Sequence, residues 1–128
     1  MTSKYKILHL ENNPLYIVVF ENFINAKLDV DYEYVINTQD AYKWLEKQKP
    51  NLLIVDLMLF DDYNTIPGEA FVKEIAVKYP SLKIMVLTGW NGDGPRKRLK
   101  KYVIHYETKA FRPSKLKEQM VKILKAPH

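Results

Sequence analysis

A single carboxylate interrupts an apolar stretch of the chain. In "NLLIVDLMLF", residues 51–60, Asp56 is surrounded by leucine, isoleucine, valine, methionine and phenylalanine. An ionised carboxylate buried in an apolar interior without partners costs more free energy than the whole stability margin of a domain. Asp56 is therefore expected at the open end of a buried strand, where positive charge can meet it.

Three more polar side chains occupy comparable positions. Glu11, Thr88 and Lys109 each end or follow a segment rich in apolar residues. Two carboxylates suit a divalent cation that prefers oxygen ligands. An ionised carboxylate next to a lysine and a hydroxyl suits phosphoryl transfer onto that carboxylate, because the positive charge offsets the repulsion between two anions. The pattern therefore predicts phosphoryl transfer onto Asp56.

Five short segments that must position these residues are typical of β-strands, because they are rich in β-branched and aromatic residues. They are residues 6–10, 32–36, 52–57, 83–88 and 103–108. The first, third and fourth are nearly continuous apolar runs, which predicts central strands covered on both faces. The second and fifth alternate with polar residues, which predicts edge strands.

Segments of helical length separate these strands. We expect helices over residues 14–27, from residue 38 to before Pro50, over 68–78, over 95–101, and from Pro113 onward. Asn13 and Thr38 are the expected N-caps of the first two. The first helix is expected to bury one apolar stripe, formed by Leu15, Val19, Phe23 and Ala26.

The regular alternation of strands and helices predicts an α/β fold with a parallel sheet between two layers of helices. In such sheets ligands bind outside the carboxyl ends of the strands. Because the chain has 128 residues and no repeat or linker, we expect a single domain over residues 1–128, with no output domain.

Composition narrows the classes of function. The chain has no cysteine, which excludes disulfides, thiolate metal sites and cysteine nucleophiles. No apolar run is long enough to cross a bilayer and no signal peptide precedes the first strand, so we expect a cytoplasmic protein with no membrane partner. The formal charge is +5, and the densest basic run is "RKRLKK", residues 96–101. We interpret this run as a solvated helix face or docking surface, and do not expect nucleic acid binding.

Four motifs resemble the receiver domain of two-component response regulators, over essentially the whole length. They are "ILHLENNP" (7–14), "LLIVDLML" (52–59), "IMVLTG" (84–89) and "YETKAF" (106–111). The resemblance implies a flavodoxin-like (βα)5 fold, a doubly wound parallel five-stranded sheet in the order 2-1-3-4-5. It also implies a signalling domain that takes a phosphoryl group from a histidine kinase or phosphotransfer protein, and not an enzyme that turns over a free substrate.

Roles follow from the resemblance position by position. Asp56 matches the phosphoacceptor, Thr88 the switch hydroxyl and Lys109 the phosphoryl partner, while Tyr106 matches the switch aromatic. The implied Mg²⁺ ligands are Glu11, Asn12, Asp56 and the backbone carbonyl of Met58. A downstream protein partner is expected to read the surface of the fourth helix, fifth strand and fifth helix. A homodimer is left open.

Two departures from the family's pattern favour a different function. Asn12 stands where the family usually has a second acid, so Mg²⁺ binding is expected to be weak. Ala110 stands where the family usually has a proline after a cis bond. A cis bond before a non-proline residue costs about 2.5 to 4 kcal/mol, so this loop is either strained or trans. Both favour the alternative of a phosphorylation-independent pseudo-receiver that acts as a protein interaction module. A basic nucleic-acid-binding domain that uses residues 96–101 is a third, weaker reading.

Two bulky residues lie close to the predicted site. Met58 and Trp90 follow Asp56 and Thr88 by two positions, and in receivers these positions flank the path of hydrolytic water. Their apolar bulk predicts a long-lived phosphoryl state.

Overall fold

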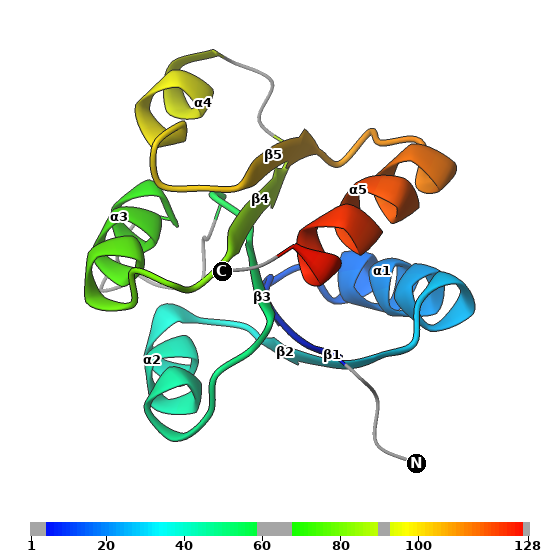
Figure 1. Ribbon diagram of the computed structural model, residues 1–128, viewed down its shortest axis with the longest axis horizontal. Coiled ribbons are helices and arrows are strands. Elements are labelled where there is room, and N and C mark those ends of the chain that lie inside the picture. Colours follow the sequence, from blue (N-terminus) through cyan, green and yellow to red (C-terminus); the bar gives the residue numbers. More distant parts are fainter. Residues whose placement is uncertain (1–4, 59–67, 90–92, 127–128) are drawn as a thin grey trace.

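The computed structural model describes residues 5–58, 68–89 and 93–126 (Figure 1). The strands are β1 (Tyr5–Leu10), β2 (Val30–Val35), β3 (Leu52–Val55), β4 (Ile84–Thr88) and β5 (His105–Thr108). The helices are α1 (Pro14–Lys27), α2 (Thr38–Lys47), α3 (Gly68–Lys78), α4 (Asp93–Leu99) and α5 (Pro113–Lys125). Among the described residues, no helix is both long enough and apolar enough to cross a membrane.

The strands form one sheet in the order β2-β1-β3-β4-β5, and all four pairings are parallel. This confirms the flavodoxin-like (βα)5 topology, with β2 and β5 at the edges. Figure 1 shows α1 and α5 on one face of the sheet and α2, α3 and α4 on the other. Every residue of β3 and β4 is buried, because both faces of these central strands are covered.

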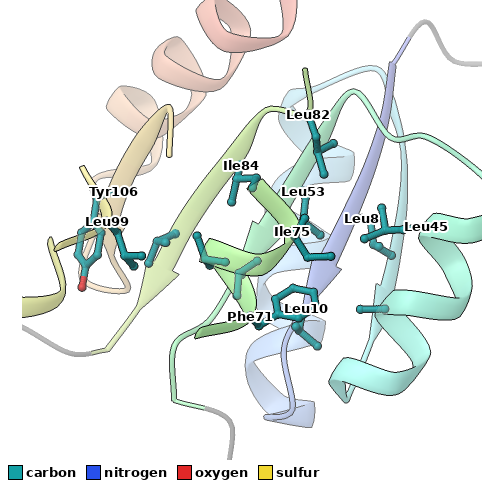
Figure 2. Close-up of a cluster of buried hydrophobic side chains, with 14 residues drawn as sticks. Leu8, Leu10, Leu45, Leu53, Phe71, Ile75, Leu82, Ile84, Leu99 and Tyr106 are labelled. Atoms are coloured by element: carbon teal, nitrogen blue, oxygen red, sulfur yellow. The ribbon is translucent and has the colours of Figure 1, made fainter. Parts of the chain in front are cut away.

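Alternate residues of each central strand supply two separate cores. On the side of α2 to α4, Leu8, Leu10 and Leu53 pack against Phe71 and Ile75, as Figure 2 shows. On the other side, the intervening strand residues pack against α1 and α5; they include Ile7, Ile54 and Met85. The nearly continuous apolar runs of these strands follow from this arrangement, since successive side chains point to opposite faces.

The buried face of α1 differs from the prediction. Ile17, Phe20 and Ile24 are the buried residues of this helix. Of the predicted stripe, Leu15 is 80% exposed and Val19 is 61% exposed. Ala26 is also exposed, and Phe23 is half-buried. The predicted stripe was wrong because α1 carries apolar residues around most of its circumference, so periodicity alone does not select a face. The selection is made by Phe20, which packs among His9, Tyr32 and Phe111.

Two helix boundaries also differ. Asn37, and not Thr38, caps α2, and its side chain accepts a hydrogen bond from the Asp40 N–H at 2.8 Å. Both residue types suit this position, so the sequence did not separate them. Helix α4 spans 93–99 and not 95–101; Pro95 fits inside its first turn, where a missing N–H leaves no intrahelical bond unmade. Asn13 caps α1 as expected, since its side chain accepts from the Leu15 and Tyr16 N–H groups.

Candidate functional site

The parallel register aligns the ends of β1 and β3. Leu10 pairs with Val55, and the N–H of Asp56 donates to the carbonyl of Leu10 at 3.0 Å. Glu11 and Asp56 are therefore the first residues beyond two neighbouring strands. Both side chains are buried, with 0% and 3% of the residue exposed. Two carboxyl groups thus meet at one edge of the sheet, almost out of contact with solvent.

Lys109 supplies the positive charge at this edge. Its N–H donates to the carbonyl of Thr88 at 2.8 Å, which anchors it beyond the end of β5. Its ammonium lies 2.5 Å from Oε1 of Glu11 and 3.1 Å from Oδ2 of Asp56. Since β4 separates β5 from β3, the long lysine side chain has to reach across the end of β4.

Lys109 also contacts an aromatic ring, and the peptide bond that follows it is trans. The ammonium lies 4.1 Å from the ring centroid of Tyr16 on α1, a favourable cation–π contact. The structure describes both Lys109 and Ala110, and the described residues contain no cis peptide bond. Of the two conformations expected for this loop, the trans one is therefore found, and Lys109 still reaches both carboxyl groups.

The backbone around Asp56 is held from two sides. Oδ1 of Asp56 accepts a hydrogen bond from the N–H of Met58 at 3.0 Å, which turns the chain as it leaves β3. The first residue of α3, Gly68, packs directly on this segment. A Cβ atom at Gly68 would lie 2.5 Å from Cα of Leu57 and 2.9 Å from the carbonyl oxygen of Asp56. The close approach therefore requires glycine at this position.

The carboxyl of Glu11 has a strongly altered affinity for protons. Burial and a hydrogen bond with Asp56 together raise the pKa of Glu11 to about 8, against the opposing effect of Lys109. Its second oxygen, Oε2, is buried and has no hydrogen-bond partner among the described residues. Within the described part of the chain, Lys109 therefore leaves one buried oxygen of Glu11 without a partner, and a bound cation could accept that oxygen as a ligand.

A cavity of about 210 Å³ opens onto this cluster. Its described lining consists of Asn12, Asn13, Asp56, Met58, Gly89 and Lys109. Within the described ranges no group of three or more His, Cys, Asp or Glu side chains is suited to a metal. The donors present are two carboxyl groups and the amide oxygen of Asn12. They fit Mg²⁺, which takes oxygen ligands, needs only one or two carboxylates and keeps several waters.

The remaining predicted residues lie further from the cavity. Thr88 is buried at the end of β4, and the next residue, Gly89, lines the cavity, whereas Thr88 itself is not among the described lining residues. Tyr106 packs in the core near Leu99, as Figure 2 shows, and does not line the cavity. Trp90 and residues 59–67 lie outside the described residues.

Three residues of the site were not predicted from the sequence. Tyr16 contacts Lys109, and Gly68 packs on the backbone of Asp56. Gly89 lines the cavity. Gly68 carried a usable signal, because the Pro-Gly pair at residues 67–68 stands directly before the predicted helix. Tyr16 carried none, since an aromatic residue in the first turn of a helix is ordinarily part of the core.

Solved receiver domains share this fold. The signal receiver domain of an HD domain-containing protein from Pseudomonas fluorescens Pf-5 is 17% identical, with a TM-score of 0.84 over 97% of this chain and 89% of that chain. The receiver domain of sensor histidine kinase PA1611 from Pseudomonas aeruginosa PAO1, with a magnesium ion coordinated in its active site cleft, is 20% identical, with a TM-score of 0.80 over 95% and 98%. A CheY-like receiver domain protein from Methanospirillum hungatei JF-1 is 17% identical, with a TM-score of 0.81 over 94% and 93%.

At these identities the structural likeness shows the fold alone. No curated protein matches the sequence significantly. The sequence profile of the response regulator receiver domain, however, matches residues 7–121, which is most of the 128-residue chain. The match includes four strands completely and most of β1, and it includes Glu11, Asp56 and Lys109 at the strand ends. The chain therefore belongs to the response regulator receiver domain family, the signalling domains of two-component systems.

Proposed function

We propose that this receiver accepts a phosphoryl group on Asp56 from a histidine kinase or phosphotransfer protein. The observation that carries the proposal is the position of Asp56 at a small cavity, with the Lys109 ammonium 3.1 Å from its carboxylate. A carboxylate there can attack phosphorus while the lysine balances the charge of the incoming phosphoryl group.

The transfer is a substitution at phosphorus. A carboxylate oxygen of Asp56 forms the new P–O bond, and the P–N bond to the donor's imidazole breaks. The imidazole leaves with the bonding electron pair and takes a proton from solvent. Lys109 contacts the phosphoryl oxygens as a point charge. The N–H of Met58, which donates to Oδ1 of Asp56, holds the nucleophile in one orientation.

Mg²⁺ would be held by Glu11, Asn12, Asp56 and the backbone carbonyl of Met58. When bound there, the ion would supply positive charge to offset that of the phosphoryl group. Lys109 already contacts both carboxyl groups, and Asn12 adds no charge, so this chain is expected to hold Mg²⁺ weakly. In this setting Thr88 and Tyr106 respond to the phosphoryl group, Thr88 from the end of β4 and Tyr106 from the core beneath α4.

The donor is expected to dock on α1. Leu15, Val18 and Val19 are 80%, 57% and 61% exposed, and they lie in the first two turns of α1, the helix that Asn13 of the cavity lining caps. Adjacent exposed apolar side chains are a common sign of a protein interface. A donor protein bound there would hold its phosphohistidine close to Asp56.

Intact-mass measurement tests the proposal. The protein is incubated with acetyl phosphate and Mg²⁺, and we expect one phosphoryl group on the wild type and none on Asp56→Asn. Asn is nearly isosteric with Asp, so this variant keeps the packing and removes only the nucleophile. Unmodified wild-type protein, in samples that give a folded spectrum, contradicts the proposal.

A pseudo-receiver that docks partners without phosphorylation is the second candidate. It is favoured by the ion pairs of Lys109 with both Glu11 and Asp56, because these pairs already occupy the lysine without a ligand. The same incubation separates the two functions. A pseudo-receiver keeps its mass and shows no spectral change with Mg²⁺ and beryllofluoride, whereas a phosphoryl acceptor responds to both reagents.

A further inference from the structure

Three groups from separate parts of the chain surround the ammonium of Lys109. Two are carboxyl oxygens of Glu11 and Asp56, at 2.5 and 3.1 Å. The third is the ring of Tyr16 in the first turn of α1, whose centroid lies 4.1 Å away. An ammonium has three N–H donors, so two can face the carboxyl oxygens while the third faces the ring. The ring attracts the cation through its π electrons and not through a carboxyl oxygen.

The contact between Lys109 and Tyr16 is close and shielded from solvent. The contact of the exposed Lys101 with the ring of Tyr102 is longer, at 5.2 Å. By comparison, 22% of the Lys109 side chain is exposed. A cation–π attraction strengthens when the cation loses its water. The contact at the cavity is therefore the stronger of the two.

The ring of Tyr16 is held in place independently of the lysine. It stacks on Phe20, with the ring centroids 6.1 Å apart and the planes inclined by 21°. Phe20 is fully buried and packs in turn against the ring of His9 on β1, at 4.9 Å. The N–H of Tyr16 also donates to the side chain of Asn13, at 3.2 Å. The ring therefore has a fixed position to which the lysine can be drawn.

The contact uses the ring of Tyr16 and not its hydroxyl. The hydroxyl is buried and has no hydrogen-bond partner among the described residues. Because a buried hydroxyl without a partner weakens folding, its removal is not expected to harm the site. Phenylalanine at this position would therefore keep the contact with Lys109, whereas leucine would lose it.

An uncharged contact suits Lys109, because phosphoryl transfer competes with its carboxyl contacts. To reach a phosphoryl group on Asp56, the ammonium has to turn N–H groups away from the carboxyl oxygens. A further carboxylate in place of Tyr16 would hold the cation but would repel the phosphoryl group. An aromatic face attracts the cation without adding charge, and it keeps water away. The loop itself gives little support, because Ala110 follows the lysine and no proline ring restricts the backbone at that position.

We propose that Tyr16 is a positioning residue for phosphoryl transfer, and that the face of its ring holds the Lys109 ammonium beside Asp56. As the phosphoryl group arrives, the N–H groups that face the two carboxyl groups turn to its oxygens, and the ring keeps the cation in place. Tyr16 thus acts on the reaction through Lys109. The inference rests on the proposed phosphorylation of Asp56 and deepens it by naming what holds its lysine.

Rates of phosphorylation by acetyl phosphate and Mg²⁺, followed by intact mass, give the first test. We expect Tyr16→Leu to slow the reaction about tenfold and Tyr16→Phe to stay within about twofold of wild type. In the Lys109→Met background, Tyr16→Leu is expected to change the rate by less than about twofold, because the cation is gone. Equal slowing in both backgrounds means that Tyr16 contributes packing only, and it overturns the inference.

A fluorinated series separates the charge of the ring face from its size. Phenylalanine, trifluorophenylalanine and pentafluorophenylalanine are placed in turn at position 16 of the full chain. Fluorine withdraws electrons and weakens the negative face of the ring, while the size of the ring changes little. We expect the rate to fall at each step, to about one tenth with the pentafluoro ring. Equal rates across the series contradict a cation–π role.

Tyr42→Leu on α2 is the matched control. Tyr42 is half-buried like Tyr16 and packs against Phe71 at 5.2 Å, but it lies on the opposite face of the sheet (Figure 1). The variant loses a similar side chain, and its rate per folded molecule is expected to stay within about twofold of wild type. Slowing equal to that of Tyr16→Leu shows a general effect of lost packing and rejects the assigned role.

Proton NMR of the unphosphorylated, isotope-labelled protein detects the contact without any chemistry at Asp56. Protons above the face of an aromatic ring are shifted upfield. We therefore expect upfield Cε protons for Lys109 in wild type and in Tyr16→Phe, and ordinary shifts in Tyr16→Leu. If wild type lacks the upfield shift, the ring does not hold the lysine and the inference falls. If the shift is present but acetyl phosphate leaves wild type unmodified, the proposed phosphorylation fails while the assigned contact stands.

Discussion

Two lysines at opposite edges of the sheet show that the same type of side chain can have a structural role or a role at the candidate site. Lys83 precedes β4 at the amino edge and is 7% exposed. Its ammonium donates to the carbonyl oxygens of Ile123 and Ala126, at 2.6 and 2.5 Å, at the C-terminal end of α5. These carbonyls lack intrahelical donors and carry the negative end of the helix dipole, so the lysine satisfies them fully.

Lys109 at the carboxyl edge has partners of another kind. It contacts the side chains of Glu11 and Asp56, and Oε2 of Glu11 remains without a partner among the described residues. The partners of Lys83 are fixed backbone groups, whereas those of Lys109 are carboxyl groups that border a cavity. A lysine that completes a helix end contributes to folding. A lysine shared between two carboxyl groups at the border of a cavity can also contact a ligand bound there.

The largest expected effect comes from Lys109→Met. Methionine keeps the length of the side chain and removes its charge, so we expect phosphorylation by acetyl phosphate to slow by at least about 100-fold. Stopped reactions analysed by intact mass give the rate. Unfolding experiments on Asp56→Asn, Lys109→Met and the double variant give the coupling between the two residues, which we expect to reach about 1–3 kcal/mol. A phosphorylation rate equal to that of wild type contradicts the assigned role of Lys109.

The same substitution at the other edge, Lys83→Met, is the matched comparison. It leaves two carbonyls of α5 without their donor, and we expect the free energy of unfolding in urea to fall by about 1–3 kcal/mol. The rate of phosphorylation per folded molecule is expected to stay within about twofold of wild type, because Lys83 is remote from the cavity. If Lys83→Met is as stable as wild type but is phosphorylated slowly, the structural role assigned to Lys83 is wrong.

Met58→Asn tests whether Met58, at the carboxyl edge, slows loss of the phosphoryl group. Met58 lines the cavity, and an amide there can hold a water molecule that an apolar side chain excludes. We expect loss of the phosphoryl group to accelerate by roughly tenfold, which corresponds to about 1.4 kcal/mol, or one added hydrogen bond. The half-life of the phosphorylated protein, followed by mass after removal of acetyl phosphate, is the measurement. A longer half-life in the variant means that Met58 does not protect the phosphoryl group.

The smallest effect is expected from the exposed ion pair between α3 and α4. The hydrogen bond from Arg98 lowers the pKa of Glu69 below its ordinary value of 4.5. A carboxyl group whose pKa is lowered in the folded state adds stability at pH values above its ordinary pKa. This added stability is lost as the pH falls through the lowered pKa. Between neutral and strongly acidic pH, wild type is therefore expected to lose up to about 1 kcal/mol more than Glu69→Gln, because the pair is screened by solvent. Parallel pH profiles of urea unfolding for the two proteins check this.

Local patterns in the sequence were sufficient for most of the fold. The strand positions and the bounds of α3 agree with the predictions, because each depends on apolar periodicity within one segment. The stripe of α1 was wrong because its apolar residues leave several faces equally suitable. The N-cap of α2 was wrong because two capping residues, Asn37 and Thr38, stand side by side.

The candidate site could be predicted only in part. Parallel strands place their carboxyl ends at one edge, so the presence of Glu11, Asp56 and Lys109 there follows from strand order. The contact between Lys109 and Tyr16 does not follow, because it depends on how α1 lies against the sheet. The roles of Thr88 and Tyr106 stay predictions, since neither residue is among those that line the cavity in the described structure.

The sequence by itself determined the alternation of elements and the residue types at the strand ends, because both are written in short segments. Tertiary structure alone decided that one ammonium serves two carboxyl groups and that the peptide after Lys109 is trans. Lys109 and Glu11 are 98 residues apart in the chain, and the distance between their charges depends on every element that lies between them. Ionic contacts of this kind are short-ranged in space and have no counterpart in local periodicity.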